Sequence, residues 1–183
     1  SNTVDAYDNN LVHSTPEILS VARYFFTAAN VGRFALFAGG FNKTPYNTVD
    51  AYDENLNRTT PTGLSVKRYH PVATSRADYA VFAGGLTGSN AYSNAVDAYD
   101  EELKRTTLTG LTLSRAYLAG VSIEKKVLFA GGYNGTYSSV VDVYDENMLR
   151  ATPLSLTVAR AYMSAATAGE YVLFAGGYNV RNS

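Results

Sequence analysis

The stretch Val49-Asp50-Ala51-Tyr52-Asp53 decides the fold, because the pattern Val-Asp-x-Tyr-Asp occurs four times at nearly equal spacing. The copies begin at residues 4, 49, 96 and 141, which gives a period of 45 to 47 residues. Self-similarity at such a period is typical of repeat architectures, in which each unit buries its apolar surface by packing on the next. The sequence therefore predicts four copies of one structural unit.

Two further markers recur with the same period. A glycine doublet follows Phe-Ala at residues 39–40, 84–85, 131–132 and 176–177. A single arginine closes a short β-prone segment in each repeat, and the four are Arg23, Arg68, Arg115 and Arg160. Three markers in step are not the result of chance, so we treat the chain as a true internal repeat.

The last repeat shows what one unit contains. Two short β-prone runs, 162–167 and 171–175, are separated by Ala168-Gly169-Glu170, which predicts a hairpin. In the other repeats, the Val-Asp-x-Tyr-Asp segment and a more polar fourth strand follow the glycine doublet. Four antiparallel strands per repeat is the content of one propeller blade, and no segment has sustained helical spacing. We therefore expect an all-β protein.

These marks resemble those of the kelch repeats. Kelch blades end their second strand with a glycine doublet and their third with Tyr-Asp, and an arginine leads into the next blade. The resemblance covers the whole chain and implies a β-propeller with four-stranded antiparallel blades. Kelch repeats usually also carry a tryptophan after the tyrosine, and the matching positions here are Ser14, Thr59, Thr106 and Ala151. The chain therefore resembles bacterial or phage-type kelch-like repeats that lack this tryptophan.

A single domain, 1–183, is expected, with one blade divided between the two ends of the chain. The expected units are a half blade 1–22, full blades 23–67, 68–114 and 115–159, and a half blade 160–183. Each internal doublet lies 10 to 12 residues before the next Val-Asp pattern, and joining residue 183 to residue 1 would give 11. Because unpaired strand edges favour aggregation, we expect the two half blades to find partners.

Three arrangements satisfy this expectation. One chain closes on itself as a four-bladed ring, two chains exchange half blades in an eight-bladed ring, or the chain is a fragment of a longer propeller. A four-bladed ring needs bulky side chains in its outer wedge, whereas this chain offers alanine, valine and threonine and has no tryptophan. We favour the homodimer, and the other two arrangements remain open.

The composition excludes several classes of function. With 15 basic and 16 acidic residues the net charge is −1, so no electrostatic footprint for nucleic acid or an anionic membrane exists. No apolar run approaches the length of a membrane span, and we expect a soluble chain. There is no cysteine, and His13 and His70 are the only histidines, so we expect neither a metal nor a cofactor. The sequence does not identify the cellular compartment, and we favour an extracellular or cell-surface location.

Residues that recur in every blade are assigned structural roles, because a catalytic pair should occur once, in one cleft. We expect the repeat arginines to pair with Asp50, Asp97 and Asp142, and the aspartates that end each pattern to cap turns. The glycine doublets lack the lysine and the helix that a phosphate-binding loop requires. No catalytic residue is therefore expected.

The residues that differ between repeats are the candidates for a ligand face. As the kelch resemblance implies, the residue after each glycine doublet and those just after each repeat arginine line one face around a central channel. Carried onto this chain, the candidates are Phe25, Phe41, His70, Leu86, Tyr117, Tyr133, Tyr162 and Tyr178. Aromatic rings and amides provide contact area and adaptable hydrogen bonds at low entropic cost.

We therefore expect a non-enzymatic binding module that presents an aromatic loop face to a protein segment or a glycan. The alternative is a purely structural repeat unit of a larger bacterial surface or phage protein, in which the aromatic rings fill the channel or brace the loops. A hydrolase or lyase with a site in the channel is disfavoured, because no blade carries its own cluster of acids.

Overall fold

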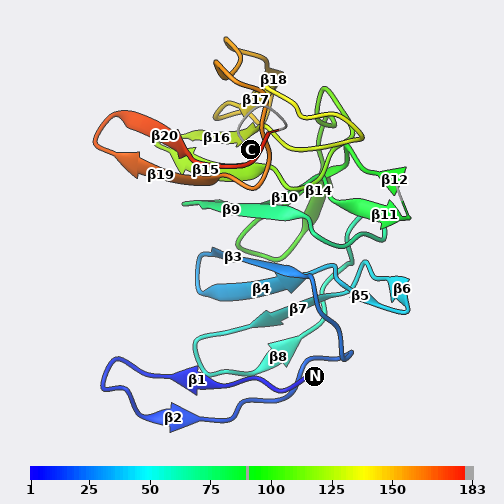
Figure 1. Ribbon diagram of the computed structural model, residues 1–183. Helices are drawn as coiled ribbons and strands as arrows, with labels where there is room; N and C mark the ends of the chain where they lie inside the picture. Colours follow the sequence, from blue (N-terminus) through cyan, green and yellow to red (C-terminus); the bar gives the residue numbers. More distant parts are fainter. Residues whose placement is uncertain (90, 180–183) are drawn as a thin grey trace.

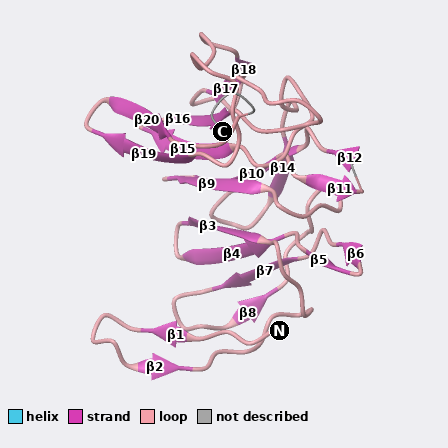
Figure 2. Cartoon of the chain, viewed as in Figure 1, coloured by secondary structure: helices cyan, strands magenta, loops and turns pink. Residues whose placement is uncertain are grey.

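The protein consists of strands, turns and loops, without a helix in the part that the structure describes (Figure 2). The computed structural model describes residues 1–89 and 91–179. The predicted all-β class is therefore confirmed. Among these residues no helix is long and apolar enough to cross a membrane.

Three four-stranded antiparallel sheets form the body of the molecule. The first complete sheet contains β3 (Thr27–Val31), β4 (Phe34–Ala38), β7 (Val49–Tyr52) and β8 (Arg58–Thr59). The second contains β9 (Val72–Arg76), β10 (Tyr79–Ala83), β13 (Val96–Tyr99) and β14 (Arg105–Thr107). The third contains β15 (Ala119–Ile123), β16 (Lys126–Ala130), β17 (Val141–Tyr144) and β18 (Arg150–Ala151). Each complete sheet therefore repeats the same four-strand order.

Two-stranded sheets stand on either side of these three. The N-terminal hairpin is β1 (Ala6–Tyr7) with β2 (His13–Ser14), and the C-terminal hairpin is β19 (Ser164–Ala168) with β20 (Tyr171–Ala175). The hairpin expected near residues 162–175 is thus confirmed, with its first strand starting at Ser164. Two smaller hairpins follow glycine doublets: β5 (Phe41–Asn42) with β6 (Thr44–Pro45), and β11 (Leu86–Gly88) with β12 (Ala91–Tyr92).

The sheets follow one another along the chain as a stack (Figure 1). Their first strands lie side by side, since β3 contacts β9, β9 contacts β15 and β15 contacts β19. The N-terminal and C-terminal hairpins lie at opposite ends of the stack in Figure 1, and no pairing joins them. Repeated four-stranded antiparallel sheets are therefore confirmed, whereas the chain by itself does not form the closed ring of a four-bladed monomer.

The core lies between successive sheets rather than inside any one of them. Leu36 of the first complete sheet and Phe82 of the second belong to one buried apolar cluster. Phe129 and Tyr144 of the third complete sheet pack with residues of the second in another. This arrangement is typical of a repeat protein, in which each unit is stabilised by packing against its neighbours.

The glycine doublets are required where one sheet meets the next. Gly84 has a φ of +64°, and a Cβ built on it would lie 2.6 Å from the carbonyl oxygen of Arg115. The next residue, Gly85, donates its backbone N–H to that same carbonyl at 3.0 Å. Only glycine combines the left-handed backbone with this close approach. The doublet therefore docks each sheet on the arginine segment of the following one.

Candidate functional site

A buried arginine organises the loop end of each complete sheet. The Arg23 guanidinium donates to Asp50 Oδ2 at 2.7 Å, and neither side chain is exposed. It also donates to the carbonyl oxygens of Gly39 at 2.8 Å and Phe37 at 3.0 Å. One side chain thus ties together the arginine segment, the glycine doublet and the third strand. A buried charge is tolerated in a protein only with such complete pairing.

The same pair recurs in the other two complete sheets. Arg68 lies 2.9 Å from Asp97, and Arg115 lies 2.8 Å from Asp142, in each case without exposed surface. Burial alone would raise the pKa of Asp50, but hydrogen bonds from Ser20 and Arg23 more than offset it and hold the pKa below its ordinary value. All three carboxylates are buried and paired with an arginine of the scaffold, so none of them is accessible to a substrate.

The arginine segment also brings the two candidate columns together. The residue after each arginine forms a β-bridge with the residue after a glycine doublet: Tyr24 with Phe41, Tyr69 with Leu86, Ala116 with Tyr133, and Ala161 with Tyr178. The other four candidates come one residue after these bridges along the chain, and they are Phe25, His70, Tyr117 and Tyr162. All eight predicted face residues are therefore gathered at the end of the sheets that carries the doublets.

Phe25, His70, Tyr117 and Tyr162 form a continuous row of rings, which we call the aromatic row. The ring centroids of Phe25 and His70 are 4.1 Å apart and those of Tyr117 and Tyr162 are 4.6 Å apart, both pairs stacked. His70 and Tyr117 join the two pairs at 5.3 Å. The row thus crosses the three complete sheets and reaches the C-terminal hairpin.

The backbone of the aromatic row is left-handed at every member. The φ angles are 58°, 51°, 59° and 59° for Phe25, His70, Tyr117 and Tyr162. A large side chain rarely adopts this conformation, which costs of order 1–3 kcal/mol at each residue. Backbone hydrogen bonds between neighbours hold it, from His70 N to Phe25 O at 2.8 Å and from Tyr162 N to Tyr117 O at 2.9 Å. The scaffold therefore imposes the row against local preference.

The aromatic row is uncharged and only partly covered. Phe25 and Tyr162, at its two ends, are exposed, whereas His70 and Tyr117 are half-buried. Burial lowers the pKa of His70, which keeps its imidazole neutral near pH 7. Burial and the neighbouring Tyr162 raise the pKa of Tyr117, so its hydroxyl keeps its proton.

The candidate residues that directly follow the glycine doublets are less uniform than predicted. Leu86 is only 6% exposed and adds no surface, which corrects its place among the face residues. Its hairpin is longer than the other and contains a bulge between Leu86 and Gly88, so Tyr92 pairs directly across from it. Phe41 and Tyr133 are half-buried, and Tyr178 is exposed.

Four tyrosines of this region were missed by the sequence reasoning. The rings of Tyr24 and Tyr69 both contact Phe41. Tyr92 contacts Tyr133, and Tyr137 contacts both Tyr133 and Tyr178. A signal for two of them was present, since Tyr24 and Tyr69 directly follow repeat arginines. The candidate face is therefore richer in tyrosine than the eight predicted positions suggested.

No protein-family model matches the chain, and no curated protein is significantly similar to it. The kelch-like marks therefore stand as a resemblance in residues and spacing.

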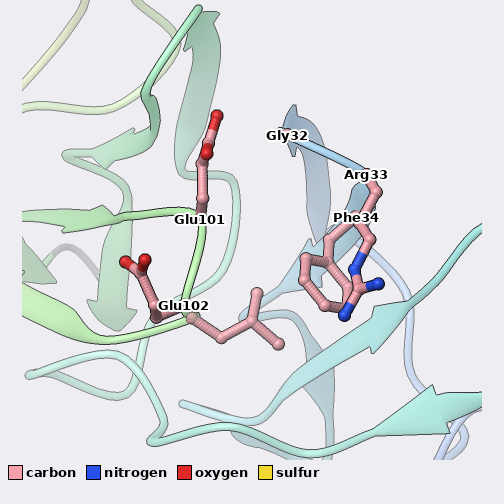
Figure 3. A pocket seen from close by; sticks show the side chains of 6 residues that line it. Gly32, Arg33, Phe34, Glu101 and Glu102 are labelled. Carbon is pink, nitrogen blue, oxygen red and sulfur yellow. The ribbon is translucent and has the colours of Figure 1, made fainter.

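Cavities at the opposite end of the sheets belong to the scaffold. One of about 590 Å³ lies between the β3–β4 and β13–β14 turns and is lined by Arg33, Phe34, Glu101 and Glu102, among others (Figure 3). A smaller cavity of about 300 Å³ occupies the equivalent place between the next two sheets. Within the described residues, no group of three or more acidic or histidine side chains could hold a metal ion. These cavities are gaps that recur between neighbouring sheets.

Proposed function

We propose that this chain is a non-enzymatic binding module that receives an extended, uncharged polypeptide segment on the aromatic row and the tyrosines around it. The observation that carries the proposal is the row itself: four large side chains held in a left-handed backbone, as two stacked pairs that a tilted contact between His70 and Tyr117 joins. Backbone strain of this kind is concentrated at functional sites, where it pre-organises contact groups. A rigid aromatic surface loses little conformational entropy when a partner binds.

The ring geometry favours a polypeptide over a glycan. The inner rings of the row, His70 and Tyr117, have neighbouring rings on both sides at 4.1 to 5.3 Å, so their faces are less available to a ligand than their edges. A sugar typically stacks flat on a free ring face, whereas peptide groups and apolar side chains pack well against ring edges and phenol hydroxyls. The face also lacks the charge that would select an ionic partner.

The buried ion pairs support a non-enzymatic role. Asp50, Asp97 and Asp142 are each engaged by an arginine, and all three lack exposed surface. General acid-base chemistry needs a group within hydrogen-bonding reach of the substrate. The recurrent carboxylates therefore stabilise the sheets that carry the row.

A display experiment tests the proposal. A library of uncharged peptides of about twelve residues is selected on the protein, and the enriched peptides are measured against Tyr117→Ala, which removes an inner ring. We expect Tyr117→Ala to weaken binding at least tenfold, and Leu149→Ala, which truncates an exposed side chain on the β17–β18 turn, to leave it unchanged. Thermal unfolding of each variant verifies that it is folded.

Two outcomes contradict the proposal. If no peptide is enriched and a glycan array gives a signal that Tyr117→Ala abolishes, the partner is a carbohydrate. If neither assay gives a signal and Tyr117→Ala only lowers the melting temperature, the row braces the loops of a purely structural unit. The ring-to-ring contacts within the row are the observation that favours this second function.

A further inference from the structure

The two terminal hairpins are complementary halves of one complete sheet. In every complete sheet the second strand pairs with the third, for example Phe82 opposite Asp97. The C-terminal hairpin corresponds to the first and second strands, with Arg160 and a glycine doublet, and the N-terminal hairpin corresponds to the third and fourth. Strand β20 and strand β1 are therefore each left with one unpaired edge.

Apolar side chains that are buried in the complete sheets are exposed on these hairpins. Tyr7 of β1 is 66% exposed, whereas its equivalent Tyr99 is fully buried. Leu173 of β20 is 53% exposed, whereas its equivalent Leu36 is fully buried. The two edges thus present the apolar surface that a completed sheet would cover.

The charged groups are complementary too. The Arg160 guanidinium donates to the carbonyl oxygens of Val158 and Phe174, as Arg23 does to the equivalent residues. Within the described residues, however, no carboxylate forms an ion pair with Arg160, whereas Arg23, Arg68 and Arg115 each pair with an aspartate. Asp5, the equivalent of Asp50, is exposed and contacts only His13 among the described side chains, at 2.8 Å. The arginine of one hairpin lacks the carboxylate that the other hairpin provides.

The surroundings of Gly176 and Leu154 also lack the strands that cover the equivalent residues of the complete sheets. A Cβ on Gly176 would meet nothing within 4 Å, although at the equivalent Gly84 it would meet an arginine carbonyl oxygen. Leu154 is 95% exposed. The equivalent segments accept hydrogen bonds from third-strand tyrosines, as Thr109 does from Tyr144 at 2.7 Å. Both residues lie where the third strand and the following sheet would pack.

We infer that a second copy of this chain seats its N-terminal hairpin against the C-terminal hairpin of the first and completes a fourth four-stranded sheet. Following the register of the complete sheets, Val172 pairs with Tyr7, Leu173 with Ala6, Phe174 with Asp5 and Ala175 with Val4. Arg160 then reaches Asp5 of the second copy. The exposed end of one aromatic row, Tyr162, meets the exposed end of the other, Phe25.

A second copy is the occupant that fits best. Within one chain the two hairpins lie at opposite ends of the stack and do not pair (Figure 1). Two identical chains docked reciprocally use each edge once and leave none open, which is the closed symmetry that most soluble oligomers adopt. This inference does not rest on the proposed function, because it concerns the sheet edges and not the aromatic face.

Engineered cysteines test the register directly, because the chain contains no cysteine. One preparation carries Leu173→Cys and another carries Ala6→Cys, and the two are mixed and oxidised. Directly opposed residues of antiparallel strands have Cα atoms about 4.5–5.5 Å apart, which a disulfide spans. We expect a cross-linked species of about twice 19.7 kDa in the mixture and much less from either preparation alone. Tyr171→Cys mixed with Ala6→Cys is the control, since it is displaced by two residues on the same strand face.

Two results overturn the inference. The first is a native mass of 19.7 kDa by light scattering at high protein concentration, together with no cross-link in the mixture. The second is a cross-link that forms only when both cysteines are in one chain, which shows closure within the chain.

The ion pair provides an independent measurement. Arg160→Ala should weaken dimerisation by on the order of a hundredfold, because it leaves a buried carboxylate without its partner. Arg33→Ala, on the exposed β3–β4 turn, is the matched control and should leave the dissociation constant unchanged. Equal dissociation constants for the two variants contradict the proposed pairing.

Discussion

The three complete sheets and the two terminal hairpins are built from the same sequence pattern but differ in nearly every physical property. In the complete sheets the arginine, the aspartate and the tyrosine of each repeat are buried and hydrogen-bonded. In the hairpins Asp5 and Tyr7 are exposed, and Arg160 has no carboxylate partner in the described chain. The comparison teaches that the pattern encodes contacts, and that these contacts form only where the other two strands of the sheet supply the partner groups.

The largest difference in stability loss between a complete sheet and a terminal hairpin should appear when the aspartate of the pattern is replaced by alanine. Asp97→Ala leaves Arg68 as an unpaired buried charge and should lower the free energy of unfolding by about 3–5 kcal/mol. Asp5→Ala removes an exposed group and should cost less than about 1 kcal/mol in the monomer. Urea unfolding at low protein concentration measures both. Equal losses would contradict the distinction between the two regions.

Glycine substitutions should give the next largest difference in stability loss between a complete sheet and a terminal hairpin. Gly84→Ala combines a left-handed backbone with a Cβ 2.6 Å from a carbonyl oxygen, so we expect a loss of about 2–5 kcal/mol. Gly176→Ala has the same backbone but open space, so only about 1–2 kcal/mol should be lost in the monomer. Thermal unfolding of the two variants checks this. If a second copy packs on Gly176, the loss for Gly176→Ala should grow with protein concentration.

Removing one tyrosine hydroxyl should have a smaller effect. Tyr144→Phe deletes the hydrogen bond to the Thr109 carbonyl oxygen and should cost about 1 kcal/mol. Tyr7→Phe is the control, because that ring is exposed on the N-terminal hairpin and the change should be neutral in the monomer. The urea midpoints of the two variants, measured at low protein concentration, distinguish their effects on stability. A loss for Tyr7→Phe as large as that for Tyr144→Phe would contradict the comparison.

The smallest expected effect concerns His13. Arginines hold the equivalent position in the complete sheets, and Arg58 approaches Asp50 to 3.2 Å from the fourth strand. His13 contacts Asp5 in the same way but with a single ring nitrogen. His13→Arg should therefore tighten dimerisation about two- to fivefold, because a guanidinium can bind the carboxylate and a neighbouring carbonyl oxygen together. Sedimentation at several concentrations measures the change, and weaker association would contradict it.

Several features of the fold follow from local pattern. The hairpin around Gly169 was predictable because two β-prone runs flank a turn-forming residue, and the structure has strands at Ser164–Ala168 and Tyr171–Ala175. The pairing of Arg23 with Asp50 was predictable because both residues recur with the period of the repeat. Charged side chains that recur with the same period can form the same ion pair in every repeat.

Other features of the candidate site were not predictable. The left-handed backbone of Phe25 and Tyr162 runs against the preferences of large side chains, and inter-sheet hydrogen bonds impose it. Leu86 is buried, and it lies in a hairpin that has a bulge and a longer loop than its counterparts. In both cases the contacts come from a neighbouring segment, and no local pattern specifies them.

The sequence by itself determined the all-β class and the four repeats. Periodicity carries this information, because each repeat must present the same contact groups to its neighbours. Only the tertiary structure decided that the terminal hairpins do not pair, that Arg160 has no carboxylate partner among the described residues and that four aromatic rings form one row across the sheets. The physical reason is that the pairing of the terminal hairpins and the contacts between aromatic rings both depend on how successive sheets pack. No single repeat contains this information.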